Sequence, residues 1–161
     1  MIALGTLLAN LKIGKTIPKI ETGHCPIPLF REGTRKASLM ANLTNSLAAV
    51  MQLPGAIGAA IVDMESGMSL GQAGGGTLNL EVAAAGNTEV VRAKMRVMAD
   101  LGLTDEIEDI LITLGTQYHV IRPLKGKGSA GLFIYVALEK TRANLALSRH
   151  KINEIAATLT V

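Results

Sequence analysis

Three segments of the chain carry apolar residues at helical spacing. They run from about residue 37 to Met51, from about Asn79 to Leu101 and from about Thr141 to Thr158. Positions three and four residues apart share one face of a helix, so each segment predicts an amphipathic helix. Leu53-Pro54-Gly55 and Gly102 follow the first two segments, and such residues are typical of helix ends.

A β-hairpin is expected between the first two helices. Its strands are Ala56–Asp63 and Met68–Gly71, joined by the turn Met64-Glu65-Ser66-Gly67. In this turn we expect Asp63 to accept hydrogen bonds from backbone amides and Gly67 to adopt a positive φ. The glycine-rich run Gly71–Gly76 is interpreted as the loop that leads to the second helix.

Three further strands are expected between the second and third helices, at Glu106–Leu114, Gln117–Leu124 and Gly131–Glu139. In the last of these, Phe133 and Tyr135 should face one side of the sheet and Ile134 and Val136 the other. The element order is then α-β-β-α-β-β-β-α. It predicts an α+β fold with a five-stranded antiparallel sheet sandwiched by helices.

Charge divides the chain into two parts. Residues 1–36 contain six basic and two acidic residues, a net charge of +4, whereas the remainder contains ten basic and eleven acidic residues, a net charge of −1. We therefore expect a basic N-terminal arm over residues 1–36 and a near-neutral domain over residues 37–161. Clustered arginines and aromatic residues would mark a nucleic-acid surface, and the sequence is only 2% aromatic, so we predict no nucleic-acid partner.

Two further features bear on the compartment. The uncharged stretch from Ala37 to Val62 is interrupted by asparagines, a glutamine and Pro54-Gly55, so it lacks the roughly 20 continuous apolar residues of a membrane span. A single cysteine, Cys25, cannot form an internal disulfide. We therefore predict a cytoplasmic protein that does not insert into a membrane.

Side chains suited to catalysis or metal binding are scattered. The histidines stand at positions 24, 119 and 150, and the sequence contains neither an HExxH nor a CxxC motif. His24 and Cys25 are adjacent, but adjacency in sequence does not make a nucleophile and base pair. The acidic residues from Asp105 to Asp109 are interpreted as a solvated loop and strand face. We accordingly predict no catalytic residue, no metal site and no cofactor.

Two glycine-rich segments are alternatives for phosphate binding. Gly71–Thr77 precedes a helix, as a phosphate loop does, but lacks the GK[ST] sequence. Lys125–Ser129 contains lysines but joins two strands, and we favour a plain hairpin loop there. A hydrolase or transferase that uses Gly71–Thr77 is kept as one hypothesis, and it requires nucleotide to change the melting temperature.

The second helix, capped by Asn79 or Thr77, carries a broad apolar face. One arc of roughly 160° on a helical wheel holds nine apolar residues, whereas four charged residues lie opposite. The apolar set is Leu80, Ala83, Ala84, Val90, Val91, Met95, Val97, Met98 and Leu101, and the charged set is Glu81, Glu89, Arg92 and Arg96.

Two polar residues, Asn87 and Lys94, fall in the middle of that apolar arc. An unpaired amide or ammonium is costly inside a monomer core, and a polar residue on an apolar helix seam sets register between associating helices. We expect one flank of the arc to cover the sheet and the other to meet an identical helix, with Asn87 and Lys94 near the seam. The alternative is a helix broken at Gly86, with Asn87 capping the second piece.

The run Leu53–Asp63, followed by Glu65-Ser66-Gly67 and then by a helix, three strands and a helix, resembles the roadblock family. That family includes the dynein roadblock light chains, the Ragulator subunits and the bacterial gliding-polarity regulators. The resemblance covers about Ser38 to Thr158. The runs Ala85–Lys94 and Ile110–His119 further resemble a bacterial subgroup of stand-alone roadblock proteins.

The resemblance implies a non-catalytic homodimer in which the second helix and the third, edge strand pair with their copies. Carried onto this sequence, the implied interface contains Val91, Met95, Met98, Ile110, Leu111 and Ile112, in addition to Asn87 and Lys94 from the helical wheel. The family also implies a scaffold that regulates or anchors a small Ras-like GTPase. The alternative is a small-ligand sensory domain with a buried cavity in which His119 and Arg122 converge.

Overall fold

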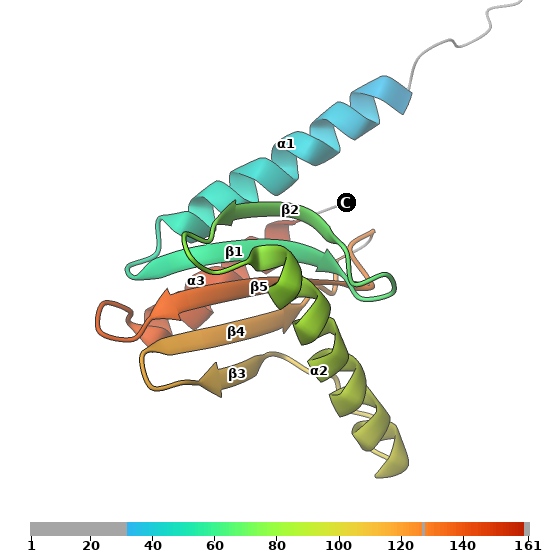
Figure 1. The fold of residues 1–161 in the computed structure, drawn as a ribbon. Helices are drawn as coiled ribbons and strands as arrows, with labels where there is room; N and C mark the ends of the chain where they lie inside the picture. The colour runs from blue at the N-terminus through green and yellow to red at the C-terminus, as the bar shows by residue number, and fades with distance from the viewer. Residues whose placement is uncertain (1–31, 127, 160–161) are drawn as a thin grey trace, which may run out of the picture.

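A five-stranded antiparallel sheet separates two layers of helices in the computed structural model, which describes residues 32–126 and 128–159 (Figure 1). The strands lie in the order β2-β1-β5-β4-β3. Their bounds are Ala56–Asp63 for β1, Ser69–Gly74 for β2, Ile110–Thr113 for β3, Gln117–Pro123 for β4 and Leu132–Glu139 for β5. The predicted α+β sandwich and its element order are confirmed.

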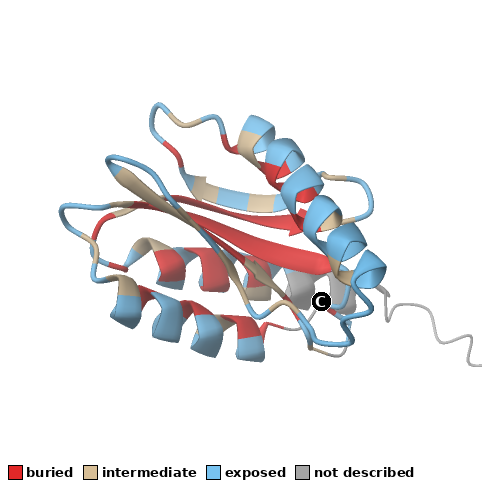
Figure 2. Ribbon diagram, turned by 90° about the horizontal axis from the view of Figure 1, so that it is seen from below, coloured by how far each residue is buried: buried red, intermediate tan, exposed pale blue. Residues whose placement is uncertain are grey.

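Two helices, α1 (Glu32–Met51) and α3 (Leu145–Thr158), cover one face of this sheet, and α2 (Leu80–Asp100) crosses the other (Figure 1). The central strand β5 is buried along nearly its whole length (Figure 2). It supplies side chains to both layers. Ile134 and Val136 pack with α1 and α3, whereas Phe133 and Tyr135 pack with α2, as the alternation predicted. None of the helices within the described part is long and apolar enough to span a membrane.

The first hairpin forms as expected at its turn. Asp63 accepts hydrogen bonds from the backbone amides of Glu65 and Ser66 and from the Ser66 hydroxyl, and Gly67 has φ +73°. The pKa of Asp63 is lowered mainly by the hydrogen bond from the Ser66 hydroxyl and next by the hydrogen bond from the Ser66 amide. A charged acceptor thus closes the turn without a longer loop.

The second strand of this hairpin lies further along the chain than predicted. The prediction placed it at Met68–Gly71 and interpreted Gly71–Gly76 as a loop, but residues 71–74 pair with β1. Glycines are needed there because neighbouring backbone comes very close: a Cβ on Gly58 in β1 would lie 2.7 Å from the Gly75 nitrogen. The glycine run is therefore an edge strand that allows close packing rather than a loop that cradles a ligand.

The helix bounds differ from the predictions at three points. The first helix begins at Glu32, so its first turn lies within the stretch assigned to the basic arm, and residues 1–31 lie outside the described residues. The second helix is continuous through Gly86, so the alternative of a broken helix is wrong. The third begins at Leu145 rather than near residue 141, because the Asn144 side chain caps it by accepting from the Leu147 amide.

Candidate interaction surface

The N-terminal half of α2 is the part that packs on the sheet. Asn79 caps the helix by accepting hydrogen bonds from the amides of Glu81 and Val82 at 3.0 and 3.1 Å. The buried residues of α2 all come before residue 92, and they are Leu80, Ala84, Asn87, Thr88 and Val91. Beyond Val91 the helix extends past β1 and β2, which it contacts, and runs alongside the far edge of the sheet (Figure 1).

The C-terminal half of α2 consequently leaves apolar side chains uncovered. Val97 is 48% exposed, and Val90 and Leu101, on the same side of the helix, are exposed as well. A groove of about 480 Å³ lies between α2 and the start of β3, lined among others by Val90, Lys94 and Ile110. We call Val90, Lys94, Val97 and Leu101, together with this groove and the open edge of β3, the α2–β3 surface.

Strand β3 forms the edge of the sheet and pairs with β4 alone. It is shorter than the predicted Glu106–Leu114 because two carboxylates before it bind elsewhere. Glu106 pairs with Lys125 at 2.7 Å, and Asp109 accepts two hydrogen bonds from Arg149 on α3 at 2.8 and 2.9 Å. Four residues with an open backbone edge remain, and an open edge is a template for pairing with another strand.

The eight predicted interface residues do not all lie on this surface. Lys94 is exposed there, and Ile110, Ile112 and Met98 are half-buried beside it. Leu111 is exposed but alternates with Ile110 and Ile112, so it points to the opposite face of the sheet. Asn87 and Val91 are buried inside one copy, under the helix. Met95 is exposed but lines a different groove, on the hairpin side of α2.

Asn87 belongs to a polar chain between α2 and the sheet. Its side chain bonds the Tyr135 hydroxyl, Tyr135 meets His119 Nδ1 at 3.1 Å, and His119 Nε2 meets Gln117 Oε1 at 3.0 Å. The amide therefore has a partner within one copy, so the cost of burying it does not by itself require a second helix. Burial raises the pKa of Tyr135 and lowers the pKa of His119, so both groups remain neutral near pH 7.

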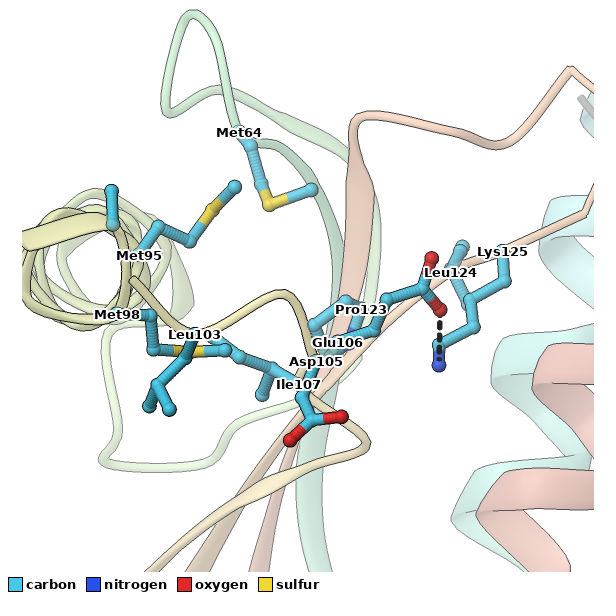
Figure 3. Close-up of a pocket in the computed structure, with 11 residues that line it drawn as sticks. Met64, Met95, Met98, Leu103, Asp105, Glu106, Ile107, Pro123, Leu124 and Lys125 are labelled. Atoms are coloured by element: carbon cyan, nitrogen blue, oxygen red, sulfur yellow. Dashed lines mark ion pairs between the residues drawn. The ribbon is translucent and has the colours of Figure 1, made fainter. Parts of the chain in front are cut away.

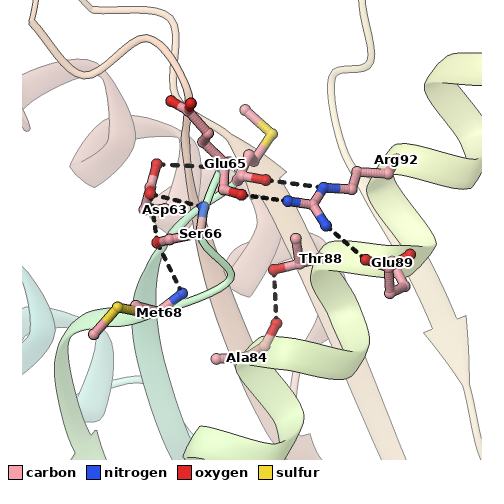
Figure 4. Close-up of polar contacts among 9 residues, drawn as sticks. Asp63, Glu65, Ser66, Met68, Ala84, Thr88, Glu89 and Arg92 are labelled. Atoms are coloured by element: carbon pink, nitrogen blue, oxygen red, sulfur yellow. Dashed lines mark hydrogen bonds and ion pairs between the residues drawn. The ribbon is translucent and has the colours of Figure 1, made fainter.

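Arg92 joins α2 to the β1–β2 turn, although the sequence placed it on a solvent-exposed face. Its guanidinium donates to the carbonyl oxygens of Met64, at 3.1 Å, and of Glu65, and it pairs with Glu89 at 2.6 Å (Figure 4). No local sequence pattern predicts these hydrogen bonds, because Arg92 lies 28 residues from Met64 and 27 residues from Glu65 in the sequence. Arg92 fixes the helix to the hairpin and is not available to a partner in the way that Arg96 is.

The pair proposed for a sensory cavity, His119 and Arg122, lies on opposite faces of the sheet. His119 contacts Tyr135 on the α2 side, whereas Arg122 contacts Asn153 and Asp109 on the α3 side. Residues separated by an odd number along a strand point to opposite faces, which explains the outcome. These two side chains therefore do not converge on one cavity.

The glycine segments considered for phosphate binding are used within the fold. Residues 71–74 belong to β2, the Gly75 amide donates to the Ile57 carbonyl, and the first amides of α2 donate to Asn79. Lys125 pairs with Glu106, and residue 127 of the second segment lies outside the described residues. In the range that the structure describes, no three His, Cys, Asp or Glu side chains gather in a way that would hold a metal ion.

Comparison with solved structures identifies the fold. The chain is similar to MglB of Myxococcus xanthus, with a TM-score of 0.60 and 16% identity over 71% of this chain and 84% of that one. It is similar to the gliding protein MglB from Thermus thermophilus, with a TM-score of 0.62 and 13% identity over 74% and 86% of the two chains.

A third solved structure, the roadblock/LC7 domain from Streptomyces avermitilis, matches with a TM-score of 0.57 and 12% identity over 68% and 86% of the two chains. No family model matches the sequence, and no curated protein matches it. The protein therefore has the roadblock fold, as the resemblance implied. Bacterial proteins with this fold, MglB among them, are the solved structures that it resembles.

Proposed function

We propose that this protein is a non-catalytic, cytoplasmic homodimeric scaffold whose two copies meet through the α2–β3 surface. The observation that carries the proposal is the apolar area left open on the C-terminal half of α2. Val90, Val97 and Leu101 are among the large hydrophobic side chains exposed in the described residues, and their spacing places them along one side of α2. A second α2 and a second β3 would cover this area and pair the open strand edge at the same time.

The chemistry of this surface suits a pair of identical copies. Its centre is apolar and contains one lysine, Lys94, while Glu106 and Asp109 line the same groove. Two helices that pack antiparallel across a twofold axis would bring Lys94 of each copy toward the acidic groove of the other. Exposed apolar positions in the centre and charges at the margin are the usual composition of a stable interface.

The proposed dimer is tested by light scattering on the full chain. Val97→Glu places a charge in the centre of the α2–β3 surface, and the mass is expected to fall from that of two chains to that of one. Leu147→Glu is the matched control, because Leu147 on α3 is 43% exposed, close to the 48% of Val97, and lies on the other face of the sheet. A wild-type protein that is monomeric at micromolar concentration would refute the proposal.

The partner we propose is a small Ras-like GTPase, and the support is the fold together with the family resemblance. One solved relative is described as MglB with a tetrameric arrangement, which shows that this fold supports assembly beyond a pair in that protein. For capture experiments, the bait is the wild-type chain, and Glu81→Arg/Arg96→Glu is the surface variant. Recovery of a GTPase by the wild type alone supports the proposal, whereas its absence from both samples contradicts it.

A further inference from the structure

A second groove lies on the hairpin side of α2, and it shares Met98, Leu103, Glu106 and Ile107 with the groove of the α2–β3 surface. Its volume is about 310 Å³ and its lining is mostly apolar. Met64 from the hairpin turn and Met95 from α2 reach toward one another across its mouth, and Met98, Leu103 and Ile107 line it below (Figure 3). We call it the methionine groove. Methionine side chains are flexible and polarizable, so such a lining adapts to aliphatic side chains.

Acidic residues border the methionine groove. Asp105 and Glu106 line it, and residues 100–109 contain five acidic residues and no basic one. Glu106 and Asp109 are engaged in ion pairs, but Asp100, Asp105 and Glu108 have none within the described part of the chain. An occupant with apolar side chains next to unpaired cations would match both the lining and the border.

One segment of the same chain has this chemistry. Residues 1–11 are apolar except for a threonine and an asparagine, and Lys12, Lys15 and Lys19 follow with no acidic residue before Glu21. We propose that residues 1–19 bind in the methionine groove, with their leucine and isoleucine side chains among the methionines and their lysines against the acidic border.

The length of the chain permits this contact. Residues 20–31 connect the proposed ligand segment to α1, and twelve residues in an extended conformation span up to about 40 Å. A domain of this size has a diameter of roughly 35 Å. A fully extended linker is therefore about as long as such a domain is wide, and the residues of the ligand segment add to its reach, so the length of the chain permits the contact within a single copy. Met64, Met95 and Asp105 line this groove and not the groove of the α2–β3 surface, so the proposed contact is centred on the hairpin side of α2.

The test uses methyl-labelled methionine in the full chain and a nitroxide attached to residue 16. The label is placed by Thr16→Cys in a chain that also carries Cys25→Ser, so that it has one attachment site. The methyl signals of Met64, Met95 and Met98 are expected to lose several-fold in intensity relative to the reduced label. The signal of Met51 at the end of α1 is the internal reference.

Charge variants separate a specific contact from chance proximity. Lys12→Glu/Lys15→Glu/Lys19→Glu is expected to restore the three signals. The matched control Arg142→Glu/Lys151→Glu, on exposed cations away from the groove, should leave the broadening in place.

Two results would overturn the proposal. Broadening centred on Met40 would place the segment against α1 and β2 instead. Unchanged methionine signals, combined with flotation of the chain on anionic vesicles that is lost in the triple lysine variant, would identify a lipid surface as the ligand.

Discussion

Arg92 offers the most direct test of how the hairpin is held to α2. In the variant Arg92→Met the apolar stem is kept, but the hydrogen bonds to the Met64 and Glu65 carbonyls and the ion pair with Glu89 are lost. These are the contacts drawn in Figure 4. The substitution therefore removes the polar contacts between α2 and the hairpin turn and keeps most of the apolar packing of the side chain.

The size of the effect follows from the exposure of the two side chains. A hydrogen bond from a cationic donor contributes about 1.5–3 kcal/mol when shielded, but the Arg92 side chain is 37% exposed, which places each carbonyl bond near or below the lower limit. The ion pair with the more exposed Glu89 adds at most ~0.5 kcal/mol. We expect Arg92→Met to lower the free energy of unfolding by about 2 kcal/mol.

Urea unfolding at one fixed protein concentration measures this loss. The midpoint should fall while the dependence on urea concentration stays unchanged, because the compactness of the two end states is the same. Glu89→Gln is the control, and its effect should stay within about 0.5 kcal/mol. If Arg92→Met costs no more than Glu89→Gln, then Arg92 does not hold the turn and the reasoning from its hydrogen bonds fails.

Three further predictions concern two glycines and the buried histidine. Gly58→Ala places a Cβ 2.7 Å from the Gly75 backbone and is expected to destabilise by about 1–3 kcal/mol in the same urea assay. Gly86→Ala, where no atom lies within 4 Å, should stabilise; destabilisation at Gly86 would contradict the description of α2. Burial lowers the pKa of His119 in the folded state. The neutral, buried imidazole therefore makes its whole contribution to the free energy of unfolding above the unfolded-state pKa of about 6.5, and this contribution is lost as the pH falls below that value. His119→Gln should reduce the fall in urea midpoint on acidification, and equal slopes for the two proteins would refute this.

Local patterns predicted most of the fold because its elements obey local rules. The alternation in residues 132–139 identified both faces of β5, and Asp63 with Gly67 identified the hairpin turn. Asn79, one of the two caps considered, marks the start of α2, because a cap bonds the first turn of its own helix. In each case the interaction that forms the structure joins residues close together in the sequence.

The site was less predictable because its contacts join distant residues. The wheel placed Asn87 and Lys94 on one line of α2, but the helix leaves the sheet between them, so that Asn87 is buried against Tyr135 and Lys94 is exposed. Sequence spacing gives the position of a residue around the helix axis, but it does not show where along its length the helix stops packing on the sheet. The placement of Arg92 also escaped prediction, since its carbonyl partners belong to the hairpin turn and carry no side-chain signal.

The connection between α2 and β3 has a consequence for binding energetics. It is fastened at Glu106, which pairs with Lys125, and again at Asp109, which is held by Arg149 from the opposite layer of the sandwich. A segment that is already held in place loses little conformational entropy when a ligand binds to it, so more of the contact energy remains as affinity. The Asp109 end of this connection, whose carboxylate is nearly buried, is thus preorganised, whereas the exposed pair at Glu106 contributes little.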